Sequence, residues 1–313
     1  MFKVFGATLS PMLVMFCYML IGFIANKCKL VPDNTASILS KLENYFFVPA
    51  LIINTFMKYC TVQSIAKEYR LILYSFGIFV IAICISIPLS QVFSGGNYYK
   101  RNIYKYALTF GNFSFMGNAI VPAILGADAL YSYMLYILPL NVAVYTWGVM
   151  ILVPKGEKKQ SVLKSLLNPI FISIIVGILL GLSGLANYVP KFAADTIGGC
   201  ASCMGPIAMI LTGMVIGGYD LKKLVKNTTV FIATLLRLIV LPVLFISILL
   251  LIKADKTTIY MTFFAFGTPL GLNTVVFPAA YGGDTSTGAS MAMISHTLCV
   301  ITIPIIFAII SII

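Results

Sequence analysis

Long stretches of apolar residues, separated by short polar interruptions, run along the whole chain. A helix needs about 20 mainly apolar residues to cross a bilayer, and ten stretches approach or exceed that length. The pattern therefore predicts an all-α integral membrane protein with ten spanning helices. Their expected ranges, in chain order, are 5–26, 38–57, 69–93, 101–125, 129–153, 165–186, 191–217, 228–252, 257–281 and 286–312.

The composition supports a membrane protein and excludes several classes of function. Of the 313 residues, 60% are hydrophobic and 10% are charged, whereas soluble proteins contain roughly 45–50% apolar and about 25% charged residues. The net charge of +12 would suggest nucleic acid in a soluble protein, but basic loops kept in the cytoplasm explain it here. No catalytic, nucleotide-binding or metal-site motif occurs. We therefore expect no enzyme activity, no cofactor, no metal site and no nucleic-acid partner.

Basic residues are distributed unevenly between the two sides of the membrane. The loops that follow spans one, three, five, seven and nine carry thirteen of the 21 Lys and Arg residues, and the opposite side carries seven. Because cytoplasmic loops are enriched in Lys and Arg, this excess places the first set of loops in the cytoplasm. With ten spans, both chain termini are then expected outside the plasma membrane.

The two halves of the chain resemble each other at the residues that interrupt helices. Residues 111–128 read GNFSFMGNAIVPAILGAD, and residues 267–284 read GTPLGLNTVVFPAAYGGD. One shift of 156 residues aligns glycines and prolines of both segments, and similar shifts align two further helix pairs. Each half has five spans, so the second half enters the membrane from the opposite side. We predict two inverted repeats, 1–153 and 165–313, joined by a cytoplasmic linker at 154–164.

Spans four and nine contain the candidate transport site. Helices interrupted by Gly and Pro at matching positions of inverted halves mark the substrate site of many transporters, because unwound backbone needs protein or water beside it. The residues expected to break or cross the helices are Gly117, Pro122, Pro269, Gly271 and Pro278. The side chains expected to bind substrate are Asn112, Ser114, Asn118, Asn273 and Thr274. Ordinary interhelical hydrogen bonding is the alternative for these polar residues.

Ionisable residues inside or near the spans are candidates for ion coupling or anion attraction. His296, the only histidine, is suited to carry a proton, with neutral helix packing as the alternative. Arg237 would either attract an anion or, as we expect, extend to the cytoplasmic interface. Glu43 and Asp195 begin spans two and seven, and we expect both at the interface. No buried carboxylate pair is predicted, so the coupling ion, H⁺ or Na⁺, stays open.

These segments resemble the auxin efflux carrier family, which includes plant PIN-type carriers and bacterial malonate- or malate-type permeases. The resemblance covers nearly the whole chain and is most specific in TPLGLNTVVFPAAYGGD and the following SHTLCVITIPI. It implies inverted repeats whose broken fourth and ninth helices cross near the midplane, where a small organic anion binds. It also implies a scaffold of spans one, two, six and seven, and homodimers. Where the family often has proline, this chain has Ala119 and Thr274, so Asn118 and Asn273 are expected to hold the breaks.

We therefore hypothesise a secondary transporter that moves a small organic anion, such as a mono- or dicarboxylate, across the lipid bilayer by alternating access. Two alternatives stay open. A cation-coupled antiporter on a related inverted-repeat fold would need a buried acidic pair. A membrane receptor or enzyme subunit without transport would need a catalytic cluster or a partner domain.

Overall fold

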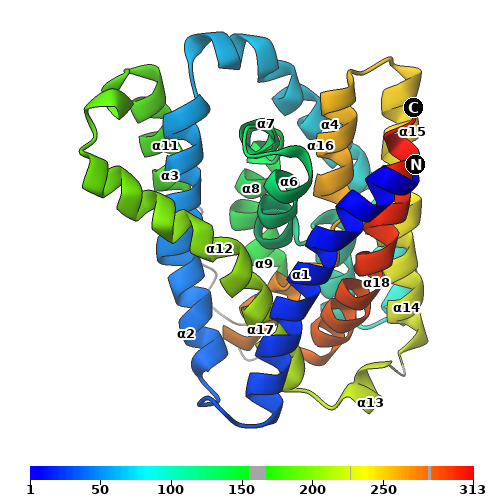
Figure 1. Ribbon diagram of the computed structural model, residues 1–313. Coiled ribbons are helices and arrows are strands. Elements are labelled where there is room, and N and C mark those ends of the chain that lie inside the picture. Colours follow the sequence, from blue (N-terminus) through cyan, green and yellow to red (C-terminus); the bar gives the residue numbers. More distant parts are fainter. Residues whose placement is uncertain (155–166, 226, 281–282) are drawn as a thin grey trace.

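The computed structural model describes residues 1–154, 167–225, 227–280 and 283–313, and its regular elements are all helices (Figure 1). The expected linker at 154–164 lies, apart from Pro154, outside the described residues. Six described helices are long and apolar enough to cross a membrane, and a pair bent by 43° adds a seventh. The two chain termini lie close together in Figure 1.

The helices of the first half include three π-helical turns, labelled η1 to η3. In chain order, its elements are α1 (Phe2–Lys27), α2 (Thr35–Leu42), η1 (Glu43–Phe47), α3 (Val48–Tyr59), α4 (Val62–Phe93), α5 (Tyr98–Thr109), η2 (Phe113–Gly117), α6 (Asn118–Leu125), α7 (Ala129–Tyr136), α8 (Leu138–Ala143), η3 (Val144–Gly148) and α9 (Val149–Leu152). The elements α2, η1 and α3 form one continuous span.

The described residues of the second half include one 3₁₀ turn, η4, and one π-helical turn, η5. In chain order, its described elements are α11 (Pro169–Leu182), η4 (Leu185–Tyr188), α12 (Lys191–Gly217), α13 (Leu221–Val225), α14 (Thr228–Leu235), η5 (Leu236–Val240), α15 (Leu241–Leu251), α16 (Lys256–Phe266), α17 (Asn273–Ala280) and α18 (Ser286–Ile310). The run from α14 to α15 is again one continuous span.

Polar side chains determine where several helices begin. At the start of α4, Thr61 accepts a bond from the backbone N–H of Ser64, and the Ser64 hydroxyl accepts one from the backbone N–H of Thr61. Asn168 accepts two backbone N–H bonds at the start of α11, and Pro169 follows it in the first helical position. Asp255 caps α16 in the same way. These bonds satisfy N–H groups that have no partner within the helix.

Helices α1 and α12 cross at very short range because both carry glycine at the contact (Figure 1). A Cβ at Gly22 would overlap the carbonyl oxygen of Ile210, and one at Gly213 would overlap that of Met19. Gly217 lies one turn further along the same face of α12. The pair Gly213 and Gly217 thus serves packing within the chain, as glycines spaced four apart predict.

A second glycine-lined contact joins α11 to α3. A Cβ at Gly177 would lie 2.8 Å from the Cβ of Phe56, and one at Gly181 would lie 2.5 Å from the carbonyl oxygen of Cys60. In both contacts the first helix of one half packs on the second helix of the other half. The four helices α1, α3, α11 and α12 therefore tie the halves of the chain together.

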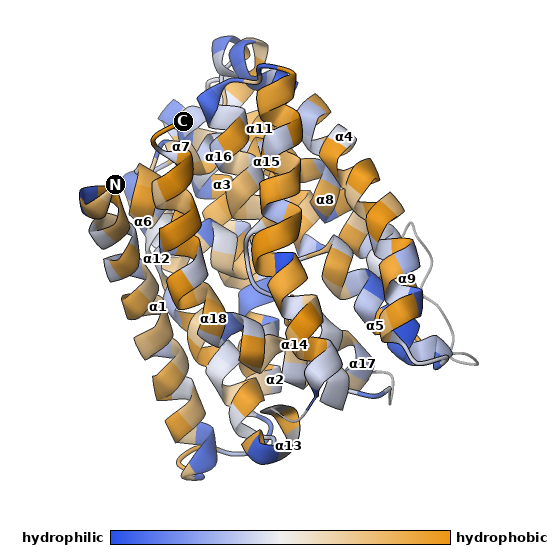
Figure 2. Ribbon diagram, turned by 90° about the vertical axis from the view of Figure 1, so that its right-hand side faces the viewer, coloured by the Kyte–Doolittle hydropathy of each residue, from blue (hydrophilic) through white to orange (hydrophobic). Residues whose placement is uncertain are grey.

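The outward faces of the helices are strongly apolar, as the hydropathy colouring in Figure 2 shows. Exposed large side chains such as Leu73 and Phe76 of α4 belong to these faces. Asp195 is exposed and pairs with Lys191, with 2.6 Å between Oδ2 and Nζ, as expected for an interfacial residue. Glu43 is different: it is 0% exposed, so its side chain does not reach lipid headgroups or water as an interfacial residue was expected to do. Helices α11 and α12 pack over its turn and cover it.

Candidate functional site

The fourth and ninth predicted spans are both broken, and the two breaks pair with each other. Residues 110–112 separate α5 from η2 and α6, and residues 267–272 separate α16 from α17. The backbone N–H of Asn112 donates to the carbonyl oxygen of Pro269 at 2.7 Å, within an antiparallel bridge. Two unwound segments thus supply hydrogen-bond partners for some of each other's backbone N–H and C=O groups deep inside the protein.

Glycine permits the close approach of the two breaks. A Cβ at Gly271 would lie 3.2 Å from the carbonyl oxygen of Gly111, and a Cβ at Gly111 would lie 2.5 Å from Nη2 of Arg237. Pro269 and Gly271 thus lie in the crossover itself.

Other residues expected to break the spans lie within regular helical turns. Gly117 ends η2, Pro122 lies inside α6, and Pro278 lies inside α17. A proline inside a helix removes one backbone hydrogen bond and can bend the helix without ending it. Pro122 and Pro278 thus lie in the helices that follow the two breaks and not in the unwound segments themselves.

The guanidinium group of Arg237 joins the carboxyl ends of α5 and α16. Arg237 is 0% exposed. Its Nη1 donates to the carbonyl oxygens of Leu108 at 3.0 Å and Thr109 at 3.4 Å, and its Nη2 donates to that of Ala265 at 3.4 Å. The ring of Phe266 lies 5.4 Å from the guanidinium carbon. Helix carboxyl ends carry partial negative charge, so a buried cation stabilises both at once.

The expected extension of Arg237 to the cytoplasmic interface is thus wrong. Carbonyl groups freed by the two helix breaks lie within reach of its side chain, and they take the place of water and lipid headgroups as hydrogen-bond acceptors.

Helix α18 holds both breaks through two side chains. His296 Nδ1 lies 2.7 Å from the carbonyl oxygen of Ala292, and its Nε2 lies 3.0 Å from Nδ2 of Asn112. Because a carbonyl only accepts, Nδ1 carries the hydrogen, and the neutral Nε2 accepts from the amide of Asn112. Ser295 Oγ accepts a bond from the backbone N–H of Leu270 at 3.0 Å. His296 therefore fixes Asn112 in position rather than facing open water.

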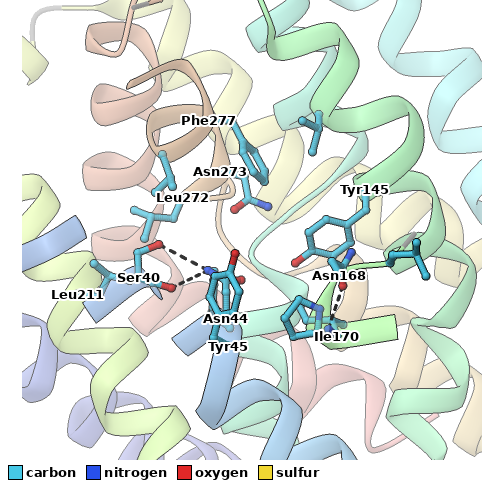
Figure 3. A pocket seen from close by; sticks show the side chains of 15 residues that line it. Ser40, Asn44, Tyr45, Tyr145, Asn168, Ile170, Leu211, Leu272, Asn273 and Phe277 are labelled. Atoms are coloured by element: carbon cyan, nitrogen blue, oxygen red, sulfur yellow. Dashed lines mark hydrogen bonds between the residues drawn. The ribbon is translucent and has the colours of Figure 1, made fainter. Parts of the chain in front are cut away.

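A first polar cavity, of about 460 Å³, lies on one side of the crossover; we name it the Asn273 cavity (Figure 3). In Figure 3 the side chains of Asn44, Tyr145 and Asn168 surround the same space as Asn273. Among the described residues that line it, none is Lys, Arg, Asp or Glu. Its lining residues are Ser40, Asn44, Tyr45, Phe115, Tyr145, Val149, Leu167, Asn168, Pro169, Ile170, Leu211, Leu272, Asn273, Val276 and Phe277.

A second polar cavity, of about 420 Å³, has Asn118 in its wall, and we name it the Asn118 cavity. The Oδ1 atoms of Asn118 and Asn54 are both buried without a hydrogen-bond partner. Its lining residues are Met15, Leu51, Asn54, Thr55, Lys58, Tyr59, Asn118, Ala119, Pro122, Ala127, Leu130, Gly198, Ala201, Ser202, Met204, Gly205 and Pro206.

Asn118 and Asn273 therefore line different cavities. Because the paired breaks are antiparallel, the chain leaves them in opposite directions, and α6 and α17 carry their first residues to different cavities.

Asn273 is the predicted substrate-binding residue that combines a cavity position with a defined partner. Its Nδ2 donates to the hydroxyl of the buried Tyr106 at 2.8 Å. Thr274 is buried, and its hydroxyl donates to the carbonyl of Gly271 at 2.9 Å. Ser114 is half-buried in η2 and lines neither cavity.

Comparison with known protein families adds a decisive observation: residues 7–307 match the family described as membrane transport protein, which is the auxin efflux carrier family. The chain belongs to this family. The match spans nearly the whole chain and confirms the resemblance drawn from its motifs. The chain is thus a multi-pass membrane transporter, and its family is one of transporters rather than enzymes. A search of curated proteins found no match.

Several polar residues around the Asn273 cavity of this transporter were not predicted from sequence. Asn44, Tyr45 and Tyr145 lie on helices other than the two broken ones. Asn168 caps the start of α11 and lines the same cavity. The repeat comparison highlights glycines and prolines that interrupt helices. Asn44, Tyr45 and Tyr145 lie within continuous helical runs, in the π-helical turns η1 and η3, and carry no such signal.

One testable contact in the transporter lies between Gly117 and Tyr133. The Tyr133 hydroxyl donates to the carbonyl of Phe113 at 2.9 Å, and a Cβ at Gly117 would overlap the hydroxyl oxygen. Gly117→Ala should therefore lower the free energy of unfolding by about 1–3 kcal/mol, the usual effect of overpacking. Thermal unfolding in detergent measures the change.

A double variant separates this collision from other effects of an added methyl group. Combining Gly117→Ala with Tyr133→Phe removes the colliding hydroxyl, so the pair should be more stable than the sum of the single losses predicts. Gly77→Ala, with nothing within 4 Å of the new Cβ, is the control. If the losses in the free energy of unfolding of the two single variants simply add in the double variant, the added methyl group does not collide with the Tyr133 hydroxyl.

Proposed function

We propose that this transporter is a secondary carrier of a small organic anion, such as a mono- or dicarboxylate, and that it works by alternating access. The observation that carries the proposal is a pair of polar cavities beside one crossover of two broken helices. Alternating access needs a site that is reached from each side of the membrane in turn. The Asn273 and Asn118 cavities are suited to be the access routes to the crossover from the two sides of the membrane.

The proposal includes ten spans arranged as two inverted five-helix repeats. The reciprocal contacts of α1 with α12 and of α11 with α3 support it, since inverted repeats exchange equivalent helices. The matched breaks after α5 and α16 support it as well. With both termini outside the cell, the Asn273 cavity would open to the cytoplasm, because it lies beside the starts of α2 and α11, which follow predicted cytoplasmic loops.

Electrostatics favours an anion as the substrate. Arg237 places a positive charge at the crossover, and it forms no ion pair with a carboxylate among the described residues. Helix α17 begins at Asn273, and helix starts carry partial positive charge. The amide and hydroxyl groups of the Asn273 cavity offer hydrogen-bond donors for a carboxylate.

Asn273→Ala should lower the uptake of the transported carboxylate by about 10-fold or more. A hydrogen bond to a charged group contributes about 1.5–3 kcal/mol, and about 1.4 kcal/mol corresponds to a factor of ten. The measurement is uptake into proteoliposomes of radiolabelled acetate, malonate, malate and indole-3-acetate. Wild-type protein must first move at least one of them.

The control for this variant is Asn187→Ala, which changes an exposed asparagine in η4. It should transport like the wild type. Equal uptake by the Asn273→Ala and Asn187→Ala proteins would refute the assignment of Asn273. Absence of flux for every carboxylate in the wild type would refute the proposed substrate class.

A further inference from the structure

Glu43 carries a carboxyl group that the proposed site does not use. It is the only buried Asp or Glu among the residues the structure describes, at 0% exposure. Neither Oε1 nor Oε2 has a hydrogen-bond partner. Burial of a polar group without a partner is unfavourable, and burial of an ionised carboxylate is far more so. A carboxyl in this position therefore tolerates the neutral form much better than the charged one.

The position of Glu43 connects it to the Asn273 cavity. Ser40 lies one turn earlier on the same helical face, and Asn44 is the next residue; both line the cavity (Figure 3). Glu43 also begins η1, where the backbone N–H of Val48 bonds to the carbonyl of Glu43. The widened turn precedes Pro49, which lacks an N–H and crowds the turn before it. Such π-helical turns often occur at functional sites.

Among the residues that the structure describes, no cation forms an ion pair with Glu43. The elements packed against η1 are α2, α3, α11 and α12. Within the described residues, the one salt bridge joins Lys191 and Asp195. Neither carboxyl oxygen of Glu43 takes part in a hydrogen bond. Helix α11 contains no ionisable side chain. The ionisable side chains on η1 and the other packed elements are Lys41, Tyr45, Lys58, Tyr59, Lys191, Asp195, Cys200 and Cys203.

We propose that Glu43 is a proton-binding site whose occupation allows the Asn273 cavity to close. While the cavity is open, water beside Ser40 exchanges protons with the carboxyl group: hydronium gives a proton to the carboxylate and leaves water, and the reverse step returns it. Glu43 is itself buried, so closure removes the nearest water and leaves an ionised carboxylate with no source of a proton. Closure therefore requires the O–H form of the side chain. This inference rests on the alternating access of the proposed function.

Two measurements test the proton site, and the first needs no substrate. Infrared difference spectra of wild-type protein between low and high pH should contain a carboxylic-acid C=O band. The band should be lost in Glu43→Gln and kept in Glu68→Gln, a matched change at the half-buried glutamate of α4. A band that persists in Glu43→Gln overturns the proposal. So does a band that responds to Na⁺ and not to pH.

The second measurement is carboxylate exchange in proteoliposomes with equal pH on both sides. Exchange by wild-type and Glu68→Gln protein should fall as pH rises, by up to about tenfold per pH unit, the limit for one titrating proton. The substrate itself changes its protonation with pH, and this affects all three proteins equally. After correction for that effect, exchange by Glu43→Gln should not change with pH. Equal pH profiles for all three proteins overturn the proposal.

The two measurements distinguish failure of this inference from failure of the proposed function. If no carboxylate moves in the wild type, the substrate class is wrong, and the infrared band alone decides whether Glu43 binds a proton. If Glu43→Gln does not fold, Glu43→Asp replaces it, and the band should shift in frequency. An unshifted band in that variant overturns the proposal.

Discussion

Replacement of Arg237 with leucine is expected to abolish transport and to lower the free energy of unfolding by about 3 kcal/mol or more. The variant removes this donor from the buried carbonyl oxygens of Leu108 and Thr109, whereas the carbonyl of Ala265 keeps a bond from the Thr268 hydroxyl. Each buried group left without a partner costs about 1–3 kcal/mol. It also removes the cation that lies at the carboxyl ends of two half-helices. Thermal unfolding in detergent and proteoliposome uptake measure the two effects.

Two further variants sharpen this prediction. Arg237→Lys keeps the charge but not the planar group that reaches α5 and α16 together, so it should recover only part of the stability. Arg70→Leu, at an exposed position of α4, is the control and should unfold like the wild type. Wild-type stability and uptake in Arg237→Leu would show that the crossover does not depend on the guanidinium group.

Gly213→Ala is expected to separate α1 from α12 and to destabilise the protein by about 3 kcal/mol or more. The added Cβ overlaps the carbonyl oxygen of Met19, which is backbone within a helix and cannot turn aside like a side chain. Overpacking usually costs about 1–3 kcal/mol, and here the whole length of the interface must shift. The yield of monodisperse protein and the unfolding temperature in detergent measure the effect.

The same helix provides a matched control for this variant. Gly199 lies in α12, and nothing lies within 4 Å of a Cβ built on it. Gly199→Ala should leave stability unchanged or raise it by up to about 1 kcal/mol, because alanine favours helix more than glycine does. If the two alanine variants are equally stable, close packing at Gly213 is not what holds α1 and α12 together.

The positions of the helix breaks were predictable because they depend on local chemistry. Pro269 and Gly271 lie in the crossover, where the missing N–H and the missing Cβ each have a local consequence. Pro122 and Pro278 carry the same sequence signal but lie inside helices. A single residue pattern indicates a tendency to break, whereas the position of the break also depends on the backbone that arrives from the other half of the chain.

The sequence did not predict which distant helices surround a given side chain. Distance along a span places Glu43 near a helix end, but helices α11 and α12, which cover it, come from the second half of the chain. Arg237 likewise lies among carbonyl groups from both breaks, one of which is more than 100 positions away in the sequence. Asn118 and Asn273 occupy matching sequence positions, yet the antiparallel pairing of the breaks assigns them to different cavities. Each of these outcomes depends on contacts between residues more than 100 positions apart.

The reciprocal pairing of α1 with α12 and of α3 with α11 bears on how the protein is made. During synthesis α1 enters the membrane long before α12 leaves the ribosome, and α3 likewise precedes its partner α11. The face of α1 that contacts α12, and the face of α3 that contacts α11, therefore face lipid until the second half is inserted. The contacts that join the two halves can therefore form only after α11 and α12 have been made, in the second half of synthesis.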